Sequence, residues 1–484
     1  MRSMRSMRSI RRAAEIACLP ACLTLAAGCQ LAPRHVRPPM PTAQAYPAEY
    51  GSDSTAGTRA SAIGWRDFIR DPRLDALISA ALTRNRDLVV AVAQIEEARG
   101  FYRIQNADRI PTVAANAGAT RTHASAGSLT GAPAGGGAVT FDRYSIGASV
   151  SAFELDFWGR VRNLSEVARS QFLSTVQAQR AFRLSVIRDV AGTYLAAVEA
   201  AERIRLAEAT VASRREGLRI AQVRFNAGIT SELEYRQAES LLTQAETELA
   251  SLRLTRARTE NALIVLVGGP VAGPLPEPLP LDQQASNLIL AAGLPSELLV
   301  ARPDIIAAEE QLRAARANIG AARAAFLPSI ALTGNAGYAS SELNGLVGAD
   351  NHTWSFGPSI NVPIFNLGRT RGNLTVAQAR KNIAVADYER AIQTAFREVA
   401  DALAGRRYLA DQRAAQERGT LAQRQIAELA RTRYNEGVVS FIEVLDAERN
   451  LFAAEQALLQ VRRAEVENLI SLYIALGGGM VEQR

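Results

Sequence analysis

The sequence predicts a mixed fold in which very long α-helices are combined with membrane β-strands, built as two copies of one structural unit. Residues 224–269 and 433–478 align without a gap and are identical at 15 of 46 positions. Each copy ends a long stretch of helical periodicity without proline, and each stretch follows two segments in which apolar and small polar residues alternate. A repeat of this length indicates an internal duplication. We therefore expect the order strand, strand, long helix and shorter helix, twice.

The N-terminus has the features of a lipoprotein signal peptide, which we place at residues 1–28. Five arginines precede an apolar stretch that is too short to span a membrane and that ends in LAAGC, residues 25–29. A cysteine after such small residues resembles the lipobox of bacterial lipoproteins. The resemblance implies a diacylglycerol and an N-acyl chain on Cys29, and Gln30 favours the outer membrane. The alternative is an ordinary signal-peptide cysteine.

Composition argues against several classes of protein. The net charge is +7, and Lys381 is the only lysine, so nearly all of the 55 basic residues are arginines. They are scattered among glutamates along the predicted helices, which favours ion-paired helix surfaces over nucleic-acid binding. With the other two cysteines in the signal peptide, we expect no disulfide and no thiol metal site. The three histidines fall in a tether and two expected loops, and the sequence has no nucleophile elbow, phosphate loop or paired-cysteine metal site. We therefore expect no metal, no other cofactor and no enzymatic activity. These histidines are His35, His123 and His352.

Periodicity divides the chain into successive segments. Residues 29–64 are rich in proline and small residues and should form an extended tether. In the first repeat, residues 65–269, we expect a helix over 71–106, strands over 112–121 and 144–155, and a helical hairpin over 159–267. Residues 270–300 form a linker. In the second repeat, residues 301–478, we expect a helix, strands over 329–338 and 354–365, and a hairpin over 369–476. A tail covers 479–484.

The strands have one apolar and one small polar face, as in the wall of an outer-membrane barrel. In the second strand we place Ala152 on the apolar face, and in the fourth strand we extend the apolar face to Val362 and Ile364. Tyr144, Tyr338 and Trp354 lie near expected strand ends, where aromatic girdles occur.

One chain offers only four strands, which cannot close a barrel, and an open edge in lipid leaves backbone groups unpaired. Eight strands from two chains would make a barrel filled with side chains. Twelve strands from three chains leave a lumen. We therefore expect a homotrimer in which a 12-stranded β-barrel continues into a 12-helix α-barrel.

The chain also resembles a known family, the TolC-like outer membrane factors of tripartite efflux pumps. Within it the chain is most similar to the NodT-type lipoproteins of resistance-nodulation-division systems. The stretches that carry the resemblance are LAAGC (25–29), WRDFIRDPRL (65–74), ELDFWGRVR (154–162), RFNAGITS (224–231), GLPSELLVARPDIIAAE (293–309), NVPIFNLGRTR (361–371) and RYNEGVVSFIEVLDAERNLF (433–452).

This resemblance implies a passive trimeric conduit that exports small molecules, such as drugs and toxic compounds, across the periplasm and the outer membrane of a Gram-negative bacterium. It implies a periplasmic adaptor (membrane fusion) protein, an inner-membrane pump of the resistance-nodulation-division type, and outer membrane lipid as partners.

The family's closed end is the periplasmic tip of the helical tunnel, where each hairpin turns. The residues that would contact the adaptor are Gly228, Ile229, Thr230, Gly437, Val438 and Val439. Ile442 and Asp446, one helical turn apart, match hydrophobic and acidic gate positions. Their counterparts in the first copy are Leu233 and Gln237. Three copies of Asp446 would form a carboxylate ring that favours cations. We interpret Glu234 and Glu443, which lie off these faces, as salt-bridge partners. The alternative for Asp446 is an ordinary surface acid.

Two other functions remain open at this point. The chain could be the exit channel of a type I secretion system, or a periplasmic coiled-coil lipoprotein without a pore. The lipobox and the GLPSELL stretch disfavour the first, and the four alternating strands disfavour the second.

Overall fold

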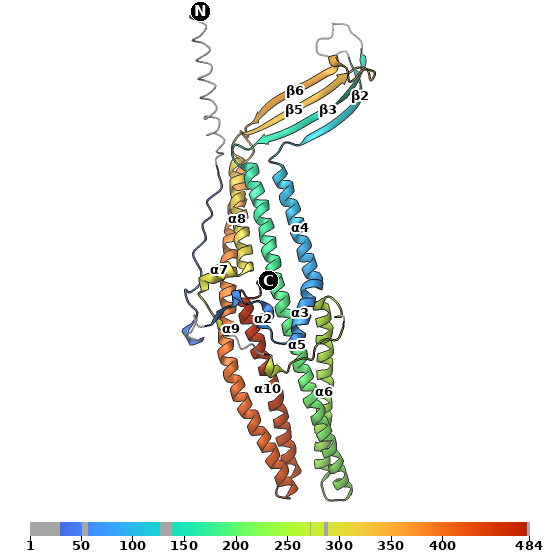
Figure 1. Cartoon of the computed structure of the whole chain (residues 1–484), viewed down its shortest axis with the longest axis vertical. Coiled ribbons are helices and arrows are strands. Elements are labelled where there is room, and N and C mark those ends of the chain that lie inside the picture. The colour runs from blue at the N-terminus through green and yellow to red at the C-terminus, as the bar shows by residue number, and fades with distance from the viewer. Residues whose placement is uncertain (1–29, 51–56, 126–137, 272, 285–288, 482–484) are drawn as a thin grey trace, which may run out of the picture. The chain divides into compact units, whose positions relative to one another are not determined.

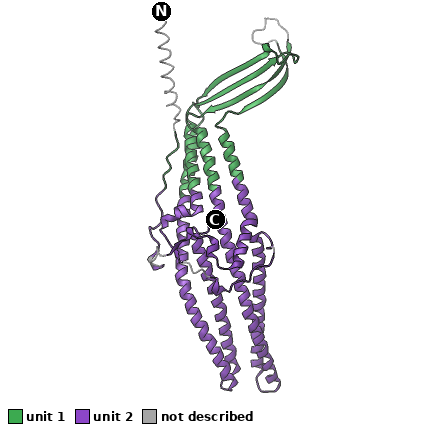
Figure 2. Ribbon diagram, viewed as in Figure 1, with its two compact units in different colours: residues 1–37, 96–174, 309–386 green, residues 38–95, 175–308, 387–484 purple. Residues whose placement is uncertain are grey.

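The computed structural model describes residues 30–50, 57–125, 138–271, 273–284 and 289–481. The chain forms two compact units (Figure 2). Unit 1 contains residues 1–37, 96–174 and 309–386, and unit 2 contains residues 38–95, 175–308 and 387–484. The predicted signal peptide and Cys29 lie outside the described residues.

Unit 1 contains an antiparallel four-stranded sheet in the order β2-β3-β5-β6 (Figure 1). The strands are β2 (Val113–Ala124), β3 (Val139–Leu155), β5 (Ser329–Ser340) and β6 (His352–Asn361). The two strands of the first repeat are longer than expected, and β2 includes His123. His352 is the first residue of β6. The expectation that these two histidines lie in loops is therefore wrong. The expectation that Val362 and Ile364 continue the last strand is wrong, because β6 ends at Asn361.

Cross-strand register explains the two faces of this sheet. Ile146 lies opposite Ala117 on one side and opposite Tyr338 on the other. Ala336 lies opposite Trp354. Residues directly opposite each other share a face, so the predicted apolar sets of all four strands coincide. On the other face, Ser149 lies opposite Asn335, which lies opposite Ser355.

A β-bulge changes the alternation near the end of β3. The register shifts between Val150 and Phe153, and Ala152 has a positive φ of 52°. Because a bulge adds one residue to one strand, Phe153 lies opposite Leu332 and remains on the apolar face. The expectation that Ala152 continues the apolar alternation is therefore wrong. The sequence pattern did not reveal the inserted residue.

Strands β3 and β5, which join the two repeats, approach each other unusually closely at Gly147 and Gly337. These two glycines lie opposite each other. A Cβ atom on Gly337 would lie 2.2 Å from the carbonyl oxygen of Ile146, and one on Gly147 would lie 2.6 Å from that of Ala336. No side chain fits at either position without moving the backbone.

Four helices contain residues of both units: α4 (Arg86–Ala107), α5 (Arg160–Asn226), α8 (Pro303–Ala324) and α9 (Arg369–Asn435). The helices α2 (Trp65–Phe68), α3 (Pro72–Arg84), α6 (Glu232–Val267), α7 (Leu298–Ala301) and α10 (Phe441–Ala475) belong to unit 2 alone. Over the described ranges, no helix combines the length and the apolar character that a membrane crossing needs.

The helix expected over 71–106 is two helices, because Asn85 interrupts it. The Asn85 side chain donates a hydrogen bond to the carbonyl oxygen of Leu266 and accepts one from the backbone N–H of Leu88. The second bond caps the start of α4. A single polar side chain thus ends one helix, starts the next and attaches both to the end of α6.

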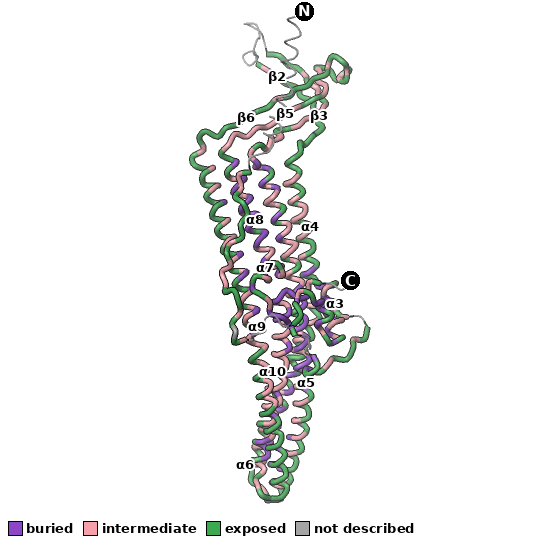
Figure 3. Tube along the Cα trace, turned by 60° about the vertical axis from the view of Figure 1, so that its left-hand side comes forward, coloured by how far each residue is buried: buried purple, intermediate pink, exposed green. Residues whose placement is uncertain are grey.

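Within unit 2 the two hairpins are held by small and aliphatic residues, and Figure 3 shows buried positions along their helices. In the first hairpin, Ile204, Ala207 and Val211 of α5 pack with a matching set on α6, which consists of Leu242, Ala245, Leu249 and Leu252. In the second hairpin the buried cluster is Ala427, Ala430, Val444 and Ala447. Spacings of three and four residues place each set on one helix face.

The linker is more structured than the sequence indicated. It contains β4 (Leu290–Ala291), which pairs in parallel with β1 (Thr58–Arg59), and the 3₁₀ turns Leu281–Gln283 and Pro295–Glu297. Asp71, which is fully buried, holds the linker in place. One of its oxygens caps α3, and the other accepts hydrogen bonds from the Tyr194 hydroxyl, the Gln284 amide and the backbone N–H of Leu279.

Candidate functional site at the hairpin tips

Both helical hairpins turn through the same backbone motif. At the end of α5, the N–H of Ile229 donates to the carbonyl of Arg224 and that of Gly228 donates to Phe225. At the end of α9, Val438 donates to Arg433 and Gly437 to Tyr434. These paired bonds define a Schellman motif, whose left-handed position favours glycine. Gly228 and Gly437 have φ values of +70° and +75°.

The second helix of each hairpin begins at a serine, but the two starts differ. The Ser231 hydroxyl oxygen accepts a hydrogen bond from the Glu234 N–H at 3.4 Å, and the Thr230 hydroxyl bonds to the Glu234 carboxylate. Ser440 makes no such side-chain cap. Glu234 is therefore part of a cap rather than the ion pair we expected.

The expected adaptor-contact residues all lie in these turns, next to their apolar neighbours at the start of the second helices. Ile229 and Val438 follow the glycines and are 66% and 63% exposed, and Leu233 is 62% exposed. Exposed aliphatic side chains at both tips leave apolar surface available for a partner.

The expected gate residues lie within two turns of the tips. Ile442 is half-buried at the start of α10. The exposed Asp446 carboxylate pairs with Arg449 at 3.1 Å. The side-chain oxygen of Gln237 on α6 is buried and has no hydrogen-bond partner among the described residues. The expected gate residues form two pairs on different hairpins. Leu233 and Gln237 lie on the first hairpin, and Ile442 and Asp446 lie on the second.

The structure shows a contact between the hairpins that the sequence did not reveal. The guanidinium of Arg224, at the end of α5, donates a hydrogen bond to the hydroxyl of Tyr434, at the end of α9, and lies 5.7 Å from the centre of its ring. The Tyr434 ring lies 5.0 Å from that of Phe441. A Cβ atom on Gly217 would lie 3.3 Å from the tip of Phe441. The second hairpin therefore packs closely against α5.

Two further arginines of α5 continue this contact away from the tip. Arg214 is buried, lies 5.7 Å from the Phe452 ring, and donates to the carbonyl of Leu241. Burial lowers its pKa. Arg203 bonds to Gln456 of α10 and pairs with Glu199. The step of eleven residues from Arg203 to Arg214 corresponds to about three helical turns and places these two arginines near one face of α5. The sequence does not indicate which residues of the second hairpin they contact.

Equivalent positions of the two repeats make different contacts. Arg433 pairs with Glu443 at 3.0 Å, which confirms Glu443 as a salt-bridge partner and keeps the bond within the second hairpin. Arg224, its counterpart, bonds across to the second hairpin instead. The ion pair tightens one tip, whereas the Arg224 bond joins the two tips.

These features match one family of known proteins. A family profile described as outer membrane efflux protein matches residues 77–269 and 294–478. The chain belongs to the outer membrane efflux protein family. The sequence-based assignment to an outer membrane efflux channel is thus confirmed.

Among the described residues, no group of three or more histidine, cysteine or acidic side chains is placed to hold a metal ion.

Individual members of the family support the match over nearly the whole chain. The solvent efflux pump outer membrane protein SrpC of Pseudomonas putida is 42% identical over 463 residues, which are 94% of this chain and 97% of that protein. The cation efflux system protein CusC of Escherichia coli K12 is 40% identical, over 95% of this chain and 99% of that one.

Solved structures agree with this assignment. The open-state outer membrane channel MtrE of Neisseria gonorrhoeae is similar with a TM-score of 0.84 and 38% identity, over 93% of this chain and 99% of that chain. A CusC structure is similar with a TM-score of 0.81 and 39% identity, over 93% of this chain and 100% of that chain. This outer membrane efflux protein is therefore an outer membrane channel component of an efflux system, with the long helices and barrel-type sheet of that fold.

Proposed function

We propose that this efflux protein works as a homotrimeric passive conduit, in which three sheets form a 12-stranded β-barrel and the helices form a 12-helix tunnel. The observation that carries this proposal is the sheet itself. In the described chain, β2 pairs only with β3, and β6 pairs only with β5. Both outer strands therefore have unpaired edges. Since an open edge in lipid costs several kcal/mol for each unsatisfied group, β6 of one copy is expected to pair with β2 of the next.

The two faces of the sheet fit this assembly. The apolar face carries Tyr144, Ile146, Tyr338, Trp354 and Phe356, and Trp354 and Phe356 are 72% and 67% exposed. Such a face suits lipid. The opposite face carries small polar residues, which suit a water-filled lumen.

The exposed tips would bind the periplasmic adaptor. The adaptor in turn would connect this channel to an inner-membrane pump of the resistance-nodulation-division type. Gly228, Ile229 and Thr230 in one turn and Gly437, Val438 and Val439 in the other supply this surface. Ile442 and Asp446 would constrict the resting pore, with Leu233 and Gln237 beside them. In the trimer the three Asp446 carboxylates would form the ring that favours cations.

A lipid on Cys29 would anchor the N-terminus in the outer membrane. The exported compounds would be small molecules, because related proteins carry names of solvent, toluene and cation efflux systems. The channel itself would supply no energy, so the pump would drive transport and select the compounds.

Purified protein and intact cells test this function together. We expect a trimer on unheated denaturing gels that dissociates on boiling, discrete conductance steps in planar bilayers, and lower toluene or drug tolerance in a strain that lacks the gene. Copurification with a tagged adaptor should depend on the tips and weaken in an Ile229→Asp, Val438→Asp variant. A monomer without conductance would overturn the proposal.

A further inference from the structure

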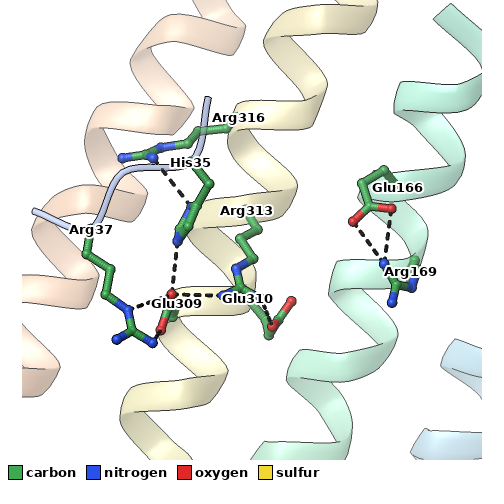
Figure 4. A network of polar contacts seen from close by, with 8 residues as sticks. All are labelled: His35, Arg37, Glu166, Arg169, Glu309, Glu310, Arg313 and Arg316. Atoms are coloured by element: carbon green, nitrogen blue, oxygen red, sulfur yellow. Dashed lines mark hydrogen bonds and ion pairs between the residues drawn. The ribbon is translucent and has the colours of Figure 1, made fainter. Parts of the chain in front are cut away.

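The strongest unexplained feature of unit 1 is the contact between the start of the described chain and helix α8. Residues 31–37, which we call the strap, bond to α8 at several points. Figure 4 shows His35 and Arg37 beside Glu309. The carbonyl oxygen of Leu31 accepts a hydrogen bond from Arg323 at 2.9 Å. Arg316 donates to the carbonyls of Arg34 at 3.3 Å and Val36 at 2.6 Å. The sequence indicated only an extended tether here.

The strap ends at a buried carboxylate. Glu309 is 3% exposed, and its side chain accepts hydrogen bonds from the His35 ring at 2.9 Å and from Arg37 at 3.0 Å. It also pairs with Arg313 of its own helix. Burial alone would raise the pKa of Glu309, but the bonds from Arg37 and His35 and the charge of Arg313 outweigh it and lower the pKa to about 2.

The His35 ring contacts two side chains of α8, one through each ring nitrogen. Its Nδ1 atom lies 3.4 Å from Arg316, which can only donate, so Nδ1 accepts. The proton of the neutral ring is then on Nε2, which donates to Glu309. A residue at this position must therefore accept on one side and donate on the other, which few side chains can do.

The lengths of the strap and of α8 match. Glu309, Arg316 and Arg323 are spaced by seven residues, which is close to two turns, so they share one face. The helix rises about 21 Å from the first to the third, at roughly 1.5 Å per residue. The strap spans at most about 20 Å between Leu31 and Arg37, at roughly 3.3 Å per residue. The strap therefore uses most of its reach along this face of α8, with a bend at Ala32.

Two further features favour this docking. Pro33 and Pro38 restrict the preceding residues to extended conformations, which lowers the entropy lost when the strap docks. On α8, a Cβ atom at Gly320 would lie 2.6 Å from the Asn163 amide of α5 and 2.8 Å from the Ala32 side chain. The lack of a side chain at Gly320 thus lets both α5 and the strap lie close to α8.

We propose that the face of α8 formed by Glu309, Arg316, Gly320 and Arg323 is a docking site for the strap, and that Glu309 selects its register. The two arginines bind backbone carbonyls, which every residue offers, whereas Glu309 binds the side chains of His35 and Arg37. The strap begins two residues after Cys29. Docking thus fixes where the lipid-bearing end joins the folded chain, and this last point rests on the proposed lipid anchor.

Limited trypsin digestion of the purified full-length protein tests this docking. The bond after Arg34 is the informative one, because Arg316 holds its carbonyl, while the bond after Arg37 precedes proline and resists trypsin. We expect Glu309→Gln to raise the initial rate of cleavage after Arg34 by about tenfold or more, since a charge-assisted bond to the strap is lost. The rate is measured by mass spectrometry.

Glu310→Gln is the matched control. Glu310 is also buried and also pairs with Arg313, but within the described part of the chain it makes no bond to the strap. Its cleavage rate should stay within about twofold of the wild type. His35→Ala should resemble Glu309→Gln, and His35→Gln, which keeps a donor and an acceptor, should restore protection. The His35 variants also answer the question if Glu309→Gln does not fold.

Equal cleavage rates in Glu309→Gln and Glu310→Gln would overturn the proposal. The lipid is tested separately by mass spectrometry of the N-terminal peptide, with Cys29→Ser as the control, because the proposed barrel would hold the protein in the membrane without a lipid. If the Glu309 effect is present but the wild-type peptide carries no lipid mass, the docking site stands and the proposed anchor fails. If the lipid mass is present but Glu309→Gln has no effect, the anchor stands and the docking site fails.

Discussion

Arg224 and Tyr434 join the two helical hairpins of the chain at their tips, through a hydrogen bond from the guanidinium to the hydroxyl and through stacking over the ring. Each residue lies in the last turn of a 67-residue helix. Because the contact lies at the far end of both hairpins, small movements at the tips must stretch or break it. The bond therefore holds the hairpins together where the proposed pore would open.

We predict that Arg224→Ala raises the open probability of the channel in planar bilayers by about tenfold, the factor that corresponds to roughly 1.4 kcal/mol. Tyr434→Phe should have a smaller effect in the same direction, because the ring contact remains. Arg433→Ala is the control, since its ion pair stays inside one hairpin. An equal rise in the control would show that loosening a single tip, rather than separating the hairpins, opens the pore.

For the proposed acidic ring, we predict that Asp446→Ala raises conductance and reduces selectivity for cations severalfold, because three carboxylates leave the pore axis. Reversal potentials in a salt gradient measure the selectivity. Glu443→Gln, a neighbouring acid that pairs with Arg433, should leave selectivity unchanged. Conductance and selectivity equal to the wild type in Asp446→Ala would rule out a role for Asp446 in the constriction.

The strap should detach at acidic pH. The pKa of Glu309 is about 2 in the folded protein against an ordinary 4.5, so its contribution to docking is complete above about pH 4.5 and is lost as pH falls toward 2. A spin label at Val36→Cys, an exposed position, should become mobile over this window. In Glu309→Gln the label should be mobile throughout, with no transition there. A transition of the same size in Glu309→Gln would show that groups other than Glu309 cause the acid-induced detachment of the strap.

The close approach of β3 and β5 should tolerate no side chain. We predict that Gly337→Val prevents stable assembly of the sheet, because overpacking against the Ile146 carbonyl costs about 1–3 kcal/mol or more in each chain. The yield of heat-modifiable oligomer in outer membranes measures this. Gly118→Ala is the control, since its nearest neighbour would be the Ser145 hydroxyl at an ordinary 3.5 Å. Normal yields of Gly337→Val would contradict the predicted clash.

The regular parts of this fold could be predicted from the sequence, because repetition makes them visible. Alternation located all four strands, and the absence of proline located both 67-residue helices. The departures came from single residues with local effects. Ala152 forms a bulge that shifts the alternation, and Asn85 divides a helix through a bond to Leu266. Neither changes the average pattern from which strands and helices are inferred.

Contacts between distant segments could not be predicted from the sequence, for a different reason. The composition of residues 30–64 indicates an extended chain, but it carries no information about which helix the chain lies on. His35 and Glu309 are 274 positions apart. The same holds for the bond from Arg224 to Tyr434, since one member is an ordinary helix arginine. At the tips, the positions of the turns followed from their glycines, whereas their side-chain partners did not.

The two hairpin turns share a backbone and differ in side chains. A binding partner that contacts main-chain atoms would find the same surface twice on every chain, around Gly228 and around Gly437. A partner that contacts side chains would find two different surfaces. One turn presents Ala227 and Thr230, and the other presents Glu436 and Val439. Duplication followed by divergence thus gives a single chain two binding surfaces with the same backbone shape and different side-chain chemistry.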